Sequence, residues 1–71
     1  MKERIKKIMM QTFGISEIPD DISQKNCEKW DSLRHLNLVV ELESEFDISI
    51  EPEEIAEMKT LSAIEKILTA K

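Results

Sequence analysis

The segment 32–46 constrains the fold most strongly, because its apolar residues recur at helical spacing on two nearly opposite sides. One side consists of Leu38, Val39, Leu42 and Phe46. The opposite side consists of Leu33, Leu36 and Val40, flanked by Asn37 and Ser44. A helix with two apolar sides is either buried all round or has a second surface for a partner. We expect the first side to enter the core and the second to be an exposed docking surface; the alternative is that both sides pack against other helices.

Three other segments show helical signals. An apolar stripe near the N-terminus is formed by Ile5, Ile8, Met9 and Phe13. It predicts a helix over 2–13, and Gly14 suits the left-handed position just past its end. Pro52 fits the first position of a short helix, with glutamates in its first turn. Thr60 is a suitable N-cap for a last helix from Leu61 to about Ala70.

A long connection, from about Ile15 to Trp30, separates the first two predicted helices. It is rich in turn-forming residues, and three isoleucines anchor it to the bundle. The alternating segment 48–50 is too short to build a sheet. The sequence therefore predicts an all-α fold, a small bundle of three main helices plus one short helix with a long first loop. Residues 1–71 are expected to form one domain and a monomer.

The size and charge of the chain restrict its function. A chain of 71 residues has a marginal core, which favours binding or carrying over catalysis in a deep site. The net charge of −5 argues against a nucleic-acid partner and favours a basic protein partner. The sequence contains neither a signal peptide nor a stretch long enough to span a membrane, so we expect a cytoplasmic protein without membrane insertion.

Asp31 and Ser32 stand where the long loop becomes the second predicted helix. Either residue type caps a helix well, so a purely structural role is one interpretation. The other is that the serine carries a group, because unpaired N–H groups at a helix N-terminus favour negative charge. A phosphodiester on the Ser32 hydroxyl would be well placed there.

Catalytic and metal sites are not predicted. A triad of Ser32, His35 and Asp31 would also need an oriented base, an oxyanion hole and a substrate pocket, for which a small bundle has little room. Cys27 is the only cysteine, so neither an internal disulfide nor a cysteine-rich metal site can form. We expect Cys27 to be a half-buried loop residue. Trp30 either covers the base of a group carried on Ser32 or fixes the loop onto the bundle.

The chain resembles an acyl carrier protein over nearly its full length. The matching motifs are Asp31-Ser32-Leu33, then Leu38-Val39 and Leu42, then the segment Glu43–Ile48, and then Ile50 followed by the glutamate-rich short helix. The resemblance implies that Ser32 carries 4′-phosphopantetheine, transferred from coenzyme A by a phosphopantetheinyl transferase. The thiol of this arm would carry acyl groups as thioesters, and the protein itself would catalyse nothing.

The resemblance also implies where partners and cargo lie. Partners would be acyl-loading, condensing or acyl-transfer enzymes of fatty-acid, polyketide or related specialised biosynthesis. They would contact the apolar residues Leu33, Leu36 and Val40 and the acids Glu41 and Asp47. The acyl chain would be sheltered on the side of Leu42 and Phe46.

Three positions depart from the pattern of housekeeping fatty-acid carriers. Arg34 and Asn37 stand where acids are usual, and Trp30 replaces a small residue. We therefore expect a specialised carrier whose partner enzymes contact Arg34 and Asn37. The alternative is that Arg34 only forms an ion pair with Asp31 or Glu41 within the helix. Two other functions remain open, an aminoacyl or peptidyl carrier and a helical interaction module that carries nothing.

Overall fold

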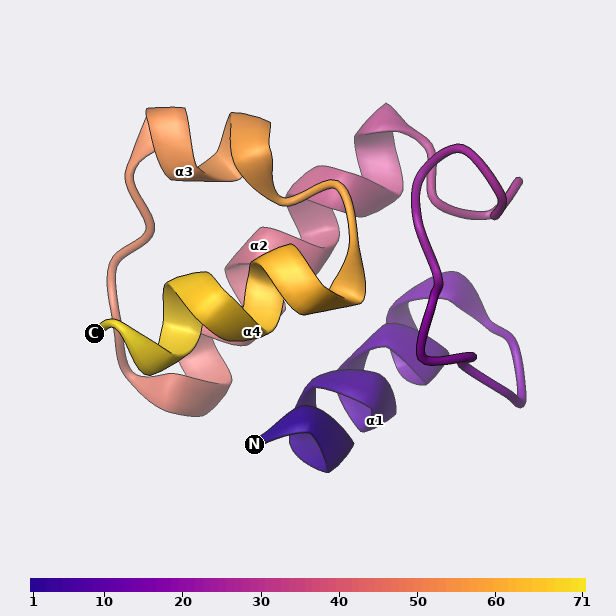
Figure 1. Cartoon of the computed structure of the whole chain (residues 1–71), viewed down its shortest axis with the longest axis horizontal. Helices are drawn as coiled ribbons and strands as arrows, with labels where there is room; N and C mark the ends of the chain where they lie inside the picture. Colours follow the sequence, from indigo (N-terminus) through magenta and orange to yellow (C-terminus); the bar gives the residue numbers. More distant parts are fainter.

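The computed structural model describes all residues, 1–71, and forms a bundle of four helices (Figure 1). The helices are α1 (Lys2–Phe13), α2 (Ser32–Phe46), α3 (Pro52–Glu57) and α4 (Leu61–Thr69). The extended pairing is limited to one isolated antiparallel bridge between Ser23 and Thr60. The predicted all-α bundle, with three main helices, one short helix and a long first loop, is confirmed. No helix has both the length and the apolar character needed to cross a membrane.

The core is a single cluster of fifteen buried residues, all of them apolar. From α2 it takes only the inner side, Leu38, Val39 and Leu42, while Phe46 is half-buried. The opposite side is exposed, with 69% of Leu33, 55% of Leu36 and 61% of Val40 accessible to solvent. The expected orientation of α2 is confirmed, and the alternative in which both sides pack against helices is wrong.

The helix ends follow the predicted signals. Gly14 has φ 69° just past α1, a left-handed conformation that costs glycine little. Pro52 begins α3, whose first turn is closed by a capping box between Glu51 and Glu54. The Thr60 hydroxyl accepts a hydrogen bond of 3.0 Å from the Ala63 N–H and so caps α4.

The first loop packs across the bundle, as expected. Ile18, Ile22 and Trp30 are buried, and Cys27 is half-buried against the core. The Ile22 carbonyl accepts a 3.2 Å hydrogen bond from the Leu61 N–H, which joins the loop to the start of α4. The loop is also joined to α1, because Lys6 donates a hydrogen bond to the Asp20 carboxylate. This hydrogen bond lowers the pKa of the Asp20 carboxyl below its ordinary value.

Two leucines on α2 test this orientation of the helix. Leu38→Ala removes a side chain with no exposed surface, so we expect it to lower the free energy of unfolding by about 2–5 kcal/mol. Leu36→Ala, on the exposed side, is expected to change it by no more than about 0.5 kcal/mol. Urea unfolding of both variants measures the difference. Equal losses would mean that both sides of α2 contribute to the core.

Candidate functional site

Ser32 is the first residue of α2 and its side chain is exposed. The preceding Asp31 has an extended backbone and is the N-cap: its Oδ1 accepts a 2.8 Å hydrogen bond from the Arg34 N–H. The cap therefore belongs to Asp31, and the Ser32 hydroxyl takes no part in it. The Ser32 side chain is therefore exposed at the start of the helix and is not used to hold the helix end.

The charge around Ser32 is locally balanced. The second carboxylate oxygen of Asp31 pairs with the Arg34 guanidinium at 2.8 Å, so the predicted alternative of an ion pair within the helix is confirmed, with Asp31 and not Glu41 as the partner. The N–H groups of Ser32 and Leu33 lie in the first turn, where no intrahelical acceptor exists. These groups and the helix dipole favour an anionic substituent at the start of α2.

Trp30 has a structural role in the loop. Only 3% of its surface is exposed, and its ring packs on Phe13 of α1 with the centroids 5.5 Å apart. Its indole Nε1–H donates a 2.9 Å hydrogen bond to Nδ1 of His35. The other ring nitrogen of His35, Nε2, lies 2.9 Å from the Ile55 carbonyl oxygen. Because both of its nitrogens are engaged, His35 is not available as a base for Ser32, and the site has no triad.

The predicted docking residues share one surface. Leu33, Leu36 and Val40 are its exposed apolar centre. Asn37 and Glu41 are exposed beside Val40, and with Gln11 and Thr12 they line a hollow of about 320 Å³ between α1 and α2. Asp47 is exposed at the far end of the helix, where it has φ 54° and forms the C-cap. The participation of Gln11 and Thr12 could not be read from the sequence, because it depends on how α1 lies against α2.

The predicted acyl-chain lining lies inside the bundle. Leu42 has no exposed surface and belongs to the core. Phe46 is half-buried, and the Arg4 guanidinium covers its ring at 4.4 Å while pairing with Glu45 at 2.9 Å. Neither Leu42 nor Phe46 borders the hollow between α1 and α2 or the groove between α3 and α4. A role in sheltering cargo remains a prediction, and it requires these contacts to open.

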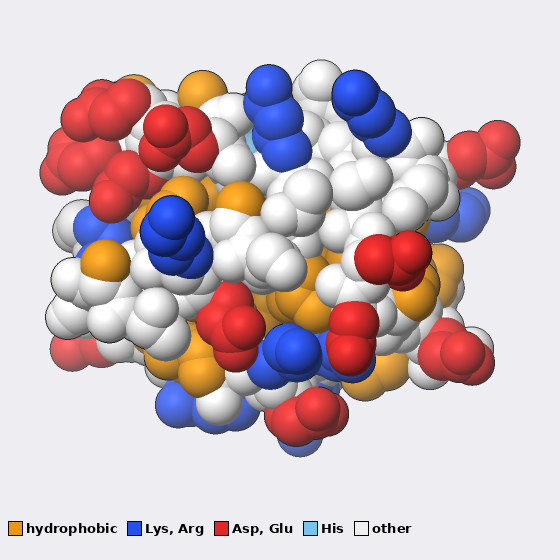
Figure 2. All heavy atoms as spheres, viewed as in Figure 1, with side chains coloured by type: hydrophobic (Ala, Val, Ile, Leu, Met, Phe, Trp, Pro, Cys, Tyr) orange, Lys and Arg blue, Asp and Glu red, His pale blue; other side chains and the backbone are white.

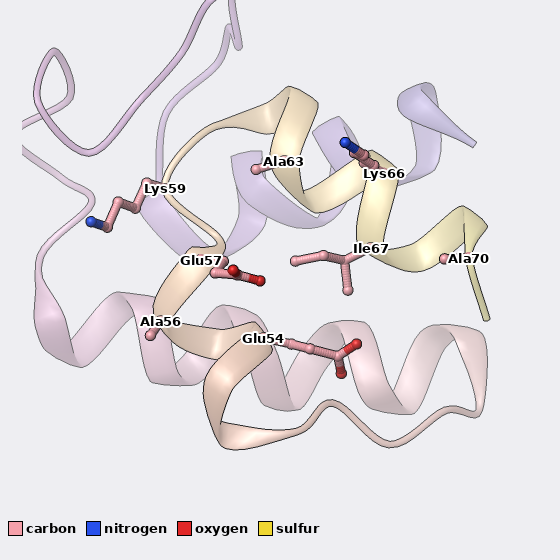
Figure 3. Close-up of a pocket in the computed structure, with 8 residues that line it drawn as sticks. All are labelled: Glu54, Ala56, Glu57, Lys59, Ala63, Lys66, Ile67 and Ala70. Atoms are coloured by element: carbon pink, nitrogen blue, oxygen red, sulfur yellow. The ribbon is translucent and has the colours of Figure 1, made fainter.

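A groove of about 580 Å³ lies between α3 and α4, and none of its lining residues comes from α2. Ile67 points from α4 towards α3, between Glu54 and Glu57 (Figure 3). Four of the eight residues that line the groove are hydrophobic. Among the others, Glu54 forms an ion pair of 2.8 Å with Lys71, and the hydrogen bond from Lys71 lowers the pKa of the Glu54 carboxyl. Acidic side chains also gather at the corner of the molecule that α3 occupies (Figure 2).

The fold is a small helical bundle with an exposed serine at the start of α2, and comparison with known proteins identifies the family. Residues 3–68 match the family described as "Phosphopantetheine attachment site". The chain belongs to this family. Its cofactor is 4′-phosphopantetheine, bound covalently, and the chain is a carrier protein and not an enzyme.

Individual relatives agree with this assignment. The D-alanyl carrier protein of Lactococcus lactis subsp. lactis (strain IL1403) is 40% identical over 57 residues, which cover 78% of this chain and 72% of the relative. The acyl carrier protein of Petrotoga mobilis is 32% identical over 71 residues, covering 97% of this chain and 84% of the relative. A solved structure of a candidate acyl carrier protein from Mycobacterium tuberculosis has the same fold, with a TM-score of 0.87 at 24% identity over 97% of this chain and 95% of that chain.

Proposed function

We propose that residues 1–71 form a single acyl-carrier domain in which Ser32 holds the 4′-phosphopantetheine arm. The observation that carries this proposal is the exposed Ser32 at the start of α2, with its hydroxyl left out of the cap that Asp31 provides. A phosphodiester on that oxygen meets the unpaired N–H groups of the first helical turn. Asp31 fixes the turn that presents the serine, and Leu33 begins the exposed apolar side beside it.

The arm supplies a terminal thiol for thioester formation, and the chain's own residues present the arm to partners. A phosphopantetheinyl transferase and acyl-loading, condensing or acyl-transfer enzymes would dock on Leu33, Leu36 and Val40. Exposed acids at Glu41 and Asp47 suit basic groups on these partners. The surface close to Ser32 is less acidic than the surface at Glu41 and Asp47, because Arg34 neutralises Asp31 and Asn37 carries no charge. This difference supports a specialised carrier with dedicated partners.

Mass spectrometry tests the attachment residue. After incubation with coenzyme A, magnesium and a broad-specificity phosphopantetheinyl transferase, the wild-type chain should gain one phosphopantetheinyl group. Ser32→Ala should gain none while keeping its fold, since Asp31 supplies the cap. Ser44→Ala, which removes another exposed serine of α2, is the matched control and should be modified as the wild type is. An unmodified wild-type chain, beside a carrier that is modified in the same mixture, would favour the helical interaction module.

A second candidate cargo is an aminoacyl group, D-alanine in particular. It is supported by the name and the 40% identity of the Lactococcus lactis relative. The tight packing of Leu42 also suits a small cargo that stays outside the bundle. An acyl group remains the first proposal, because the motifs and the acidic residues along α2 follow the acyl carrier pattern and the Petrotoga mobilis relative covers nearly the whole chain.

Charging of the modified protein separates these cargoes. We expect an acyl-loading enzyme to form a thioester and an enzyme that activates D-alanine as its adenylate to form little. The malonyl transferase of bulk fatty-acid synthesis should charge this chain more slowly than it charges a housekeeping carrier. Rapid charging with D-alanine alone would replace the acyl proposal with the aminoacyl one. Equal rates with the malonyl transferase would contradict the specialised role.

A further inference from the structure

His35 joins three parts of the chain through its imidazole ring. Its Nδ1 accepts a hydrogen bond from the Trp30 indole at the end of the first loop, and its Nε2 lies against the Ile55 carbonyl oxygen in α3, both at 2.9 Å. An indole N–H only donates and a carbonyl only accepts. The tautomer with its proton on Nε2 satisfies both contacts at once. His35, which lies near the start of α2, therefore connects this helix to the first loop and to α3, with one defined ring orientation.

The α3 helix is anchored to the core only through the partly buried Ile55 and through Met58, which follows it and is fully buried. It has six residues, none of them buried, and a helix this short is not stable alone. Its last carbonyls have no partners further along a helix. The Ile55 carbonyl accepts a long bond of 3.3 Å from the Met58 N–H and the shorter one from His35. His35 thus acts as a C-terminal cap of α3 that is supplied by α2.

Two hydrogen bonds tie the α3 region to side chains of α2, one at each end. Before α3 begins, the Ile50 N–H donates to the Glu43 carboxylate at 2.8 Å. At the other end His35 holds Ile55, and the C-terminal end of α3 faces the N-terminal half of α2 (Figure 1). Along the α2 axis His35 is about 4.5 Å from Ser32, and Glu43 is about 16 Å from it. Of the two ties, the one through His35 is therefore the nearer to Ser32 along α2.

We propose that His35 is a positioning residue of the carrier, which fixes the C-terminal end of α3 against the N-terminal half of α2 and makes it part of the surface that the phosphopantetheinyl transferase contacts. This inference rests on the proposed attachment at Ser32. With the tie in place, a partner that docks at the start of α2 finds α3 already ordered. Without it, the partner has to order α3 during binding, which weakens binding and leaves the reacting hydroxyl unchanged.

Three variants isolate the tie. His35→Leu removes both hydrogen bonds and keeps an apolar side chain of moderate size. His35→Gln retains an acceptor for Trp30 and a donor for Ile55 without an imidazole, so it should rescue the function. Glu43→Ala is the matched control, because it removes the tie at the end of α3 remote from Ser32.

Amide hydrogen exchange of the unmodified protein measures the tie itself. In His35→Leu the Met58 amide, which bonds to the same Ile55 carbonyl, should lose roughly fivefold of its protection, the size expected for one hydrogen bond. His35→Gln should exchange like the wild type. Trp30→Phe, which removes the donor that orients the ring together with part of the buried indole and keeps an aromatic ring against Phe13, provides a second test if His35→Leu does not fold, and its Met58 protection should also fall.

Steady-state kinetics of phosphopantetheine transfer measures the consequence. For His35→Leu we expect KM to rise roughly fivefold with kcat within a factor of two. His35→Gln and Glu43→Ala should keep the wild-type KM. A wild-type KM for His35→Leu, in spite of lost protection in α3, would overturn the positioning role and leave Ser32 as the attachment residue. Failure of the wild-type chain to be modified would overturn the proposed function and this inference together.

Discussion

Burial of the inner side of α2 determines what the molecule presents to solvent. Leu38 and Leu42 have no exposed surface, so α2 cannot rotate without removing them from the only core that the chain has. Since the second apolar side lies nearly opposite, the same orientation exposes Leu33, Leu36 and Val40. One packing constraint therefore determines both which side of α2 enters the core and which side is exposed. Ser32 lies at the start of α2, where it is exposed as well.

Much of this arrangement could be predicted from the sequence because it is local. Helical periodicity and the signals at Gly14, Pro52 and Thr60 specify the helices, and the two sides of α2 follow from the spacing of its own residues. The link between His35 and Ile55 could not be predicted, because it joins residues twenty positions apart and depends on the path between α2 and α3. The hollow between α1 and α2 depends on interhelical packing in the same way.

Asp31 has two roles that influence the site in opposite directions. As the N-cap it fixes the turn that presents Ser32, and this role needs only an acceptor oxygen. As a charge it would repel a phosphodiester on the neighbouring serine, but the Arg34 guanidinium compensates it at 2.8 Å. The pair is exposed, so it contributes little to stability. Its effect is on the local potential, which stays less acidic near Ser32 than at Glu41 and Asp47.

The nature of the cargo and the opening of the core are physically linked. Sheltering a group beside Leu42 and Phe46 means separating Leu42 from a core of fifteen side chains, against which the half-buried Phe46 packs, in a chain whose stability is small. The compensating free energy comes from the apolar surface of the cargo, at about 0.8 kcal/mol for each buried CH₂ group. A long acyl chain supplies enough of it to offset the lost packing, whereas an alanyl group supplies almost none. A small cargo would therefore stay outside on its tether, where a high effective concentration allows transfer between weakly bound partners.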